Sequence, residues 1–163
     1  MSVTSYAIAL GSNRRSKRGS PKDAVAAAAA AFAADRLSSV RLTPPLGPAG
    51  RSFANAAAIV SSSLSPPELL HRLKEIEQDF GRRAGKRWGP RVIDLDILLW
   101  SEGAWEEPGL VIPHPGMRLR RFVLDPLAEI APGWRDPISG ATIRQLQSRL
   151  ARPRPVDPGP CQP

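Results

Sequence analysis

The sequence predicts an α+β fold of the ferredoxin-like class, built on a βαββαβ core. Two helix-capping signals, at Ser20 and Ser65, each lie between segments of strand character. The last of these segments, 92–100, is a hydrophobic run that carries two aspartates. We expect an antiparallel or mixed sheet in which the first and fourth strands are central and parallel to each other, with the helices over one face. Extra strands and helices are expected to follow at the C-terminal end.

The first strand and the first helix lie near the N-terminus. Residues 5–10 have strand character, and the segment ends at a glycine. Ser20, Pro21 and Asp23 supply an N-cap, a first-turn proline and an acid at the third helical position. Because the alanine-rich sequence that follows favours helix, we place a helix at about 21–35.

Two further strands precede the second helix. The second strand is expected at 38–43, where Pro44 and Pro45 stop it, and the third at 53–61, after a loop with two glycines. Both segments are bounded by proline and glycine residues, which is typical of strands separated by loops.

The second helix begins with a capping box formed by Ser65 and Glu68, and Gly81 is expected to end it. Its apolar side chains recur at helical spacing on one face: Leu69, Leu73, Ile76 and Phe80. Glu77 lies beside this stripe, and three interpretations stay open for it: a surface position, a salt bridge to Arg82 and a functional role.

Shorter elements are expected beyond the fourth strand. They are a strand at 110–112, a helical segment at 118–123, a helix at 127–130 capped by Asp125 and Pro126, and a last helix to about 150 capped by Thr142 and Gln145.

Length and composition bound the organisation. A chain of 163 residues with 42% apolar residues suffices for one core, so we expect one domain over 1–150 and a Pro-rich, disordered tail over 151–163. No segment has the character of a signal peptide or membrane span, and Cys161 is the only cysteine. We therefore expect a soluble, cytoplasmic protein without a membrane partner.

The positive charge is concentrated in three segments. The net charge is +8, and basic residues gather at 14–18, 82–91 and 118–121. One such cluster is explained by an ordinary solvated loop, whereas three favour a polyanion as partner. Nucleotide phosphates and nucleic acid both meet that description.

Asp94 and Asp96 are the most informative pair of residues. Because side chains alternate along a strand, both carboxylates point to one face, about 6 to 7 Å apart. Ile93, Leu95, Ile97 and Leu99 are expected on the other face. Such a pair also occurs on solvated strand faces, but two carboxylates on one rigid strand suit hard divalent cations, and the arginines upstream suit phosphate.

Several motifs together resemble the 6-hydroxymethyl-7,8-dihydropterin pyrophosphokinase family of folate biosynthesis, in order from about residue 5 to 133. The segments that carry the resemblance are Ala9-Leu10-Gly11-Ser12-Asn13, Thr43-Pro44-Pro45-Leu46-Gly47, Phe53-Ala54-Asn55-Ala56, Gly81-Arg82, Arg87-Trp88-Gly89-Pro90-Arg91, Asp94-Leu95-Asp96 and Pro113-His114-Pro115.

The resemblance implies transfer of pyrophosphate from ATP to the hydroxymethyl group of the reduced pterin, with release of AMP. It implies ATP as co-substrate and two Mg²⁺ ions held by Asp94 and Asp96. We also expect a monomer whose partners are small-molecule substrates and not nucleic acid. By similarity the catalytic residues are Arg82, Arg91, Asp94 and Asp96, the ATP-binding residues are Arg87, Trp88, Arg91, His114 and Arg120, and the pterin-binding residues are Thr43, Pro44, Leu46, Phe53, Asn55 and Phe122.

Two positions depart from the family pattern. Ala84 stands where an arginine is common, and Arg41 where an aromatic residue is frequent. A second hypothesis is a ferredoxin-like RNA-binding module that uses the basic loops for phosphates, which predicts exposed aromatic residues on the sheet.

Overall fold

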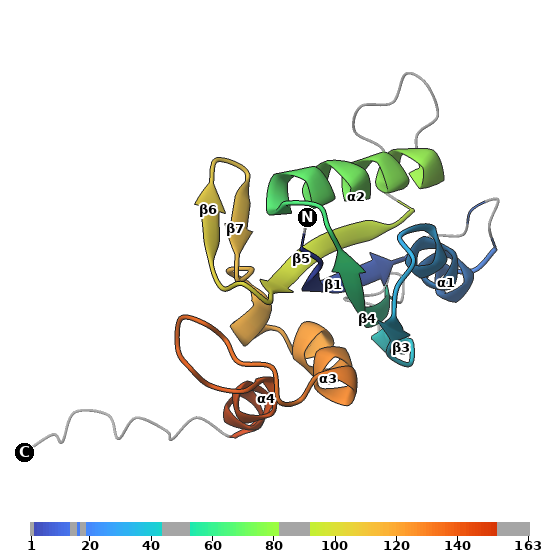
Figure 1. Cartoon of the computed structure of the whole chain (residues 1–163). Helices are drawn as coiled ribbons and strands as arrows, with labels where there is room; N and C mark the ends of the chain where they lie inside the picture. The colour runs from blue at the N-terminus through green and yellow to red at the C-terminus, as the bar shows by residue number, and fades with distance from the viewer. Residues whose placement is uncertain (1, 14–15, 17–18, 44–52, 82–91, 153–163) are drawn as a thin grey trace, which may run out of the picture.

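The computed structural model describes residues 2–13, 16, 19–43, 53–81 and 92–152 (Figure 1). Its main sheet has the strand order β2-β4-β1-β5. A fifth strand, β3, also pairs with β4. Every pairing is antiparallel. The strands are β1 (Thr4–Ser12), β2 (Arg36–Leu37), β3 (Arg41–Thr43), β4 (Phe53–Ser62) and β5 (Asp94–Trp100).

The predicted βαββαβ order is confirmed, but the predicted placement of the fourth strand is wrong. β1 and β4 are the central pair, and β5 lies at the edge of the described sheet, antiparallel to β1. α2 (Pro66–Gly81) connects β4 to β5 across β1, so the two parallel strands of this βαβ unit are separated by one antiparallel strand.

Of the strand predicted at 38–43, only β3 at 41–43 is present, and the unpredicted β2 at 36–37 precedes it. Ser38 lies between them and interrupts the pairing with β4. The Ser38 N–H donates to the Ala57 carbonyl at 2.9 Å, and the Ala57 N–H donates to the Ser38 hydroxyl oxygen at 2.9 Å. A side-chain oxygen thus accepts the bond that a strand carbonyl would accept, and the chain pairs with β4 again only at Arg41.

Helices pack on both faces of the sheet rather than on one. α1 (Pro21–Ala31) and α2 share a core with one face, and α3 (Arg121–Ile130) and α4 (Ile143–Ala151) share a core with the other (Figure 1). No described helix combines the length and apolar character that a membrane span requires.

The capping signals are confirmed, whereas two helix boundaries differ from the prediction. Hydrogen bonds of the capping-box type are present at Ser20, Ser65 and Thr142. The first helix ends at Ala31 rather than near 35. Asp125 and Pro126 do not start a helix but lie within α3.

The remaining short elements follow β5. They are a hairpin of β6 (Trp105–Glu107) and β7 (Leu110–Ile112), and the 3₁₀ turn η1 (Met117–Leu119) just before α3.

The strands alternate between the two cores, and one bulge changes this alternation. In β5, Leu95 and Ile97 face the core with α1 and α2, as predicted. The register with β1 shifts between Ala7 and Ile8, and beyond that bulge Leu98 and Leu99 both belong to the core with α3 and α4. The prediction for Leu99 is therefore wrong, because a bulge adds one residue to the two-residue period.

An ion pair between the partly exposed Arg118 and the buried Asp136 fixes η1 to the segment between α3 and α4. Asp136 is fully buried, and it accepts bonds from Arg118 Nε at 2.6 Å and Nη2 at 2.7 Å. The Ile138 N–H and the Ser139 hydroxyl also donate to it. Burial pushes the pKa of Asp136 upward, but these hydrogen bonds outweigh burial and lower the pKa to about 2.

We expect Asp136→Asn to remove a pH-dependent part of the stability. The depressed pKa means that the ionised carboxylate stabilises the fold above pH 4, and that this contribution is lost as pH falls from about 4 to about 2. Because solvent around Arg118 weakens the interaction, the carboxylate contributes about 1 to 2 kcal/mol to the free energy of unfolding.

Urea denaturation at several pH values measures the difference in unfolding free energy between wild type and the variant. That difference should be largest above pH 5 and shrink below pH 4, and Arg118→Met should lose the same pH-dependent part. A difference that does not change with pH would contradict the assignment.

Candidate active site

The strand register places the two aspartates and Asn55 on either side of Ala9 and Gly11 of β1. Because neither residue has a large side chain, they form an open floor between β4 and β5. Gly11 on β1 pairs with Asp94 on one side and with Asn55 on the other. One step along, Ala9 pairs with Asp96 on β5. Since neighbouring strands are about 4.8 Å apart, Asp94 and Asn55 lie about 10 Å apart across Gly11. This is room for a flat ligand and a phosphate chain.

Both aspartates are exposed, and the alternation expected from the sequence is present. Leu95 between them is fully buried in the opposite core. Among the described residues, the Asp96 carboxylate has no hydrogen bond or ion pair, and no cluster of three or more His, Cys, Asp or Glu side chains surrounds the pair. A ligand can therefore approach Asp96 without displacing one of these groups.

Two side-chain hydrogen bonds hold β5 in place. Glu77 of α2 is buried, and its Oε1 accepts from the Leu95 backbone N–H at 2.8 Å, while its Oε2 lies 3.2 Å from Lys74 Nζ. Ser12 donates its hydroxyl to the Val92 carbonyl at 2.5 Å. Of the interpretations left open for Glu77, a surface position is wrong: it supports the strand of the aspartates.

The opposite side of the floor carries the polar group expected to bind the pterin edge. Asn55 is buried, and its Nδ2 donates to Thr43 Oγ1 at 3.3 Å. A Cβ placed on Gly11 would lie 3.5 Å from Asn55 Oδ1, so this oxygen faces the floor at Gly11. The amide is thus held by β3, and its carbonyl oxygen points toward the place where a ligand would lie.

Two exposed aromatic rings flank the same face. Phe53 on β4 is 40% exposed, and Phe122, the second residue of α3, is 44% exposed. α3 packs over β4, and the Arg120 guanidinium lies 5.8 Å from the centre of the Phe122 ring. Both rings have surface available for stacking on a planar ligand.

His114 lies beside β5. Its backbone N–H donates to the Leu98 carbonyl at 3.0 Å, and its Nδ1 accepts from the Gly116 N–H at 3.0 Å. In the neutral ring the proton is then on Nε2, which is a donor for a ligand. A Cβ on Gly116 would come within 2.8 Å of Arg120 Cζ, so glycine leaves the space in which that guanidinium packs.

The structure thus brings most of the described candidate residues to one face of the sheet and to the start of α3. These are Thr43, Phe53, Asn55, Asp94, Asp96, Arg120 and Phe122, with His114 beside β5. The other predicted site residues lie outside the described residues: Pro44, Leu46, Arg82, Arg87, Trp88 and Arg91.

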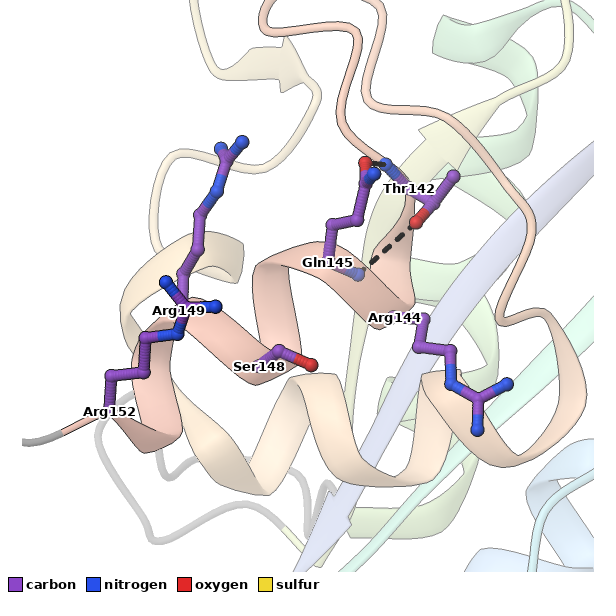
Figure 2. A pocket seen from close by; sticks show the side chains of 6 residues that line it. All are labelled: Thr142, Arg144, Gln145, Ser148, Arg149 and Arg152. Atoms are coloured by element: carbon purple, nitrogen blue, oxygen red, sulfur yellow. Dashed lines mark hydrogen bonds between the residues drawn. The ribbon is translucent and has the colours of Figure 1, made fainter.

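One surface cavity lies away from these residues. It has a volume of about 630 Å³ and lies along α4 (Figure 2). In Figure 2 the Arg144 side chain points away from those of Arg149 and Arg152. None of the predicted site residues lines this cavity.

Comparison with known proteins gives the family. The family model of the 7,8-dihydro-6-hydroxymethylpterin-pyrophosphokinases matches residues 7–132. The chain belongs to this family. The matched range includes every predicted site residue, both the described ones and those outside the described residues.

Relatives that carry the name 2-amino-4-hydroxy-6-hydroxymethyldihydropteridine pyrophosphokinase agree with this placement. The protein of Synechocystis is 47% identical over 127 residues, which cover 77% of this chain and 65% of the relative. That of Pseudomonas aeruginosa is 42% identical over 139 residues, covering 80% of this chain and 82% of the relative. The chain thus spans slightly less than two thirds of the Synechocystis protein.

Solved structures support the fold. The crystal structure of wild-type Plasmodium falciparum HPPK-DHPS matches with a TM-score of 0.70 at 14% identity, covering 91% of this chain and 41% of that chain. At this identity the likeness supports the pyrophosphokinase fold alone.

We predict that Glu77→Ala destabilises the protein by about 1 to 3 kcal/mol, because the Leu95 N–H would lose its acceptor in a buried place. Glu77→Gln keeps an acceptor oxygen and should recover much of the loss. Urea denaturation measures both, with Glu75→Ala, on the exposed side of α2, as the control. Equal losses for the alanine and glutamine variants would show that the hydrogen bond is unimportant.

Proposed function

We propose that this chain transfers a pyrophosphoryl group from ATP to 6-hydroxymethyl-7,8-dihydropterin in folate biosynthesis. The hydroxyl oxygen of the pterin attacks the β-phosphorus, the bond from that phosphorus to the oxygen bridging to the α-phosphate breaks, and AMP leaves. The hydroxyl proton passes to solvent. The observation that carries the proposal is the row Asp94-Gly11-Asn55, which joins a phosphate-side carboxylate to a pterin-side amide.

The two carboxylates fit Mg²⁺. They are hard oxygen donors, and without a third protein ligand in the described residues the remaining coordination positions are left for phosphate oxygens and water, which is the usual Mg²⁺ pattern. We infer that Asp94 and Asp96 hold two Mg²⁺ ions, which when bound neutralise phosphate charge and polarise the transferred group.

The pterin lies between Phe53 and Phe122 in this proposal. Stacking on two rings suits a flat heterocycle, and Asn55 Oδ1 accepts from the N–H groups at its edge. Thr43 orients that amide. Pro44 and Leu46 complete the wall by resemblance to the family.

ATP is held mainly by positive charge. His114 Nε2 and the Arg120 guanidinium are donors toward its phosphates or ring. Arg87, Trp88 and Arg91 bind the nucleotide, and Arg82 with Arg91 stabilises the charge that develops on transfer, by resemblance to the family. Phosphoryl-type transfer asks the protein chiefly for positioning and charge, and no covalent nucleophile is needed.

The organisation of the protein is also a proposal. One pyrophosphokinase domain over 1–150, acting as a monomer, fits a sheet that shares cores with both helical layers and supplies both substrate sides. The tail 151–163 is assigned no role, and a lone cysteine fits the reducing cytoplasm. The RNA-binding hypothesis has no support, because the matching family and the named relatives are pyrophosphokinases.

Asp96→Asn tests the metal-binding role with little change in shape. We expect AMP formation from MgATP and the pterin to fall at least about 100-fold, because one charged ligand is lost. Product chromatography measures AMP, and Glu106→Gln on β6 is the matched control. AMP release that needs no pterin, or that survives the substitution, would contradict the proposed function.

Phe122→Leu tests the stacking role. Leucine keeps apolar volume but removes the ring face, so the KM for the pterin should rise about 2- to 12-fold while the KM for ATP changes less. Phe53→Leu should behave alike. Leu42→Ala, exposed on the other side of β3, is the control, and an unchanged pterin KM in both phenylalanine variants would rule out the ring clamp.

A further inference from the structure

β3 is a weakly held element that carries part of the proposed site. It has three residues, and among the described strands it pairs only with β4, through Arg41 opposite Asn55 and Thr43 opposite Phe53. Short edge strands contribute few hydrogen bonds of their own. The connection from β2, broken at Ser38, gives it no continuous strand on the N-terminal side.

The carboxylate of Glu129 on α3 forms hydrogen bonds with Ser39, in the segment that connects β2 to β3. Glu129 Oε2 accepts from the Ser39 backbone N–H at 2.5 Å, and Oε1 accepts from the Ser39 hydroxyl at 2.6 Å. Arg41 Nη2 lies 3.6 Å from the same Oε1. The hydrogen bonds from the Ser39 hydroxyl and N–H, together with the charge of Arg41, lower the pKa of Glu129, so it is ionised at neutral pH.

The same carboxylate is linked to both walls of the proposed pterin cleft. On one side, Ser39 and Arg41 lead into β3, whose Thr43 accepts the Asn55 amide. On the other, Phe122 precedes Glu129 by seven residues, so both lie on one stripe of α3, about 10 Å apart along its axis. The Arg36 guanidinium also donates to the Ile130 carbonyl at the end of α3, at 3.4 Å.

We propose that Glu129 is a positioning residue for the pterin substrate, because its bond to Ser39 sets β3 relative to α3 and thereby sets the Asn55 amide against the Phe122 ring. This proposal rests on the proposed function. It assigns Glu129 no contact with either substrate. Loss of the link should therefore affect pterin binding while the aspartates and the ATP side keep their places.

Glu129→Ala is the direct test. The KM for the pterin should rise about 5- to 10-fold, with kcat and the KM for ATP within about twofold of wild type. Ser39→Ala removes one of the two hydrogen bonds and should give a smaller rise. Glu129→Gln, which keeps an acceptor for the Ser39 N–H, should recover part of the pterin affinity.

Thr142→Ala is the stability control. It removes the hydroxyl that caps α4, so it should lower the Tm without changing either KM. If Glu129→Ala lowers the Tm but leaves the pterin KM unchanged, or if Thr142→Ala raises that KM equally, Glu129 is only structural and the proposal is wrong.

Hydrogen exchange separates this proposal from the proposed function. In Glu129→Ala the amides of Ser39, Arg41 and Thr43 should exchange faster than in wild type. If wild type forms no AMP with the pterin, the proposed function fails, and exchange still decides whether Glu129 holds β3. Unchanged exchange would overturn the link itself.

Discussion

The antiparallel register of β1 between β4 and β5 is the constraint on which the site depends. It puts Gly11 between Asp94 and Asn55, and it turns all three toward the face of α3. A slip of one residue in β5 would turn both carboxylates into the core with α1 and α2 and expose Leu95. The hydrogen bonds from Ser12 to Val92 and from Leu95 to Glu77 oppose such a slip. The geometry of the proposed site and the packing of the core are therefore specified by the same pairing.

The edge position of β5 makes two exposed carboxylates compatible with a hydrophobic strand. In the interior of the sheet, an uncompensated charge beside packed strands would carry a desolvation cost. At the edge of the described sheet, Glu77 accepts from the buried Leu95 amide, which has no neighbouring described strand to bond there. A carboxylate of α2 thus supplies a hydrogen-bond partner for the strand that carries Asp94 and Asp96.

Features that depend on neighbours in the sequence could be predicted, and features that depend on distant partners could not. The caps at Ser20 and Thr142 and the alternation at Asp94 and Asp96 follow from local spacing. The break at Ser38, the bulge that turns Leu99, and the placement of β5 beside β1 depend on how strands far apart in sequence pair. Glu77 has one local signal, an acid beside an apolar stripe, but its partner at Leu95 is visible only in the fold.

The two supports of α3 differ in kind, and they lie on opposite sides of the point where the family match ends. Asp136 is buried, and its hydrogen bonds to the partly exposed Arg118 offset its desolvation, whereas Glu129 is exposed and relies on two bonds to Ser39. Asp136 lies beyond the range that the family model matches, while Glu129 lies within it. The start of α3, with Arg120 and Phe122, is thus supported here by a residue outside the matched range. Loss of Asp136 would therefore leave Arg118 of η1 without its carboxylate partner and loosen the start of α3 together with the packing between α3 and α4.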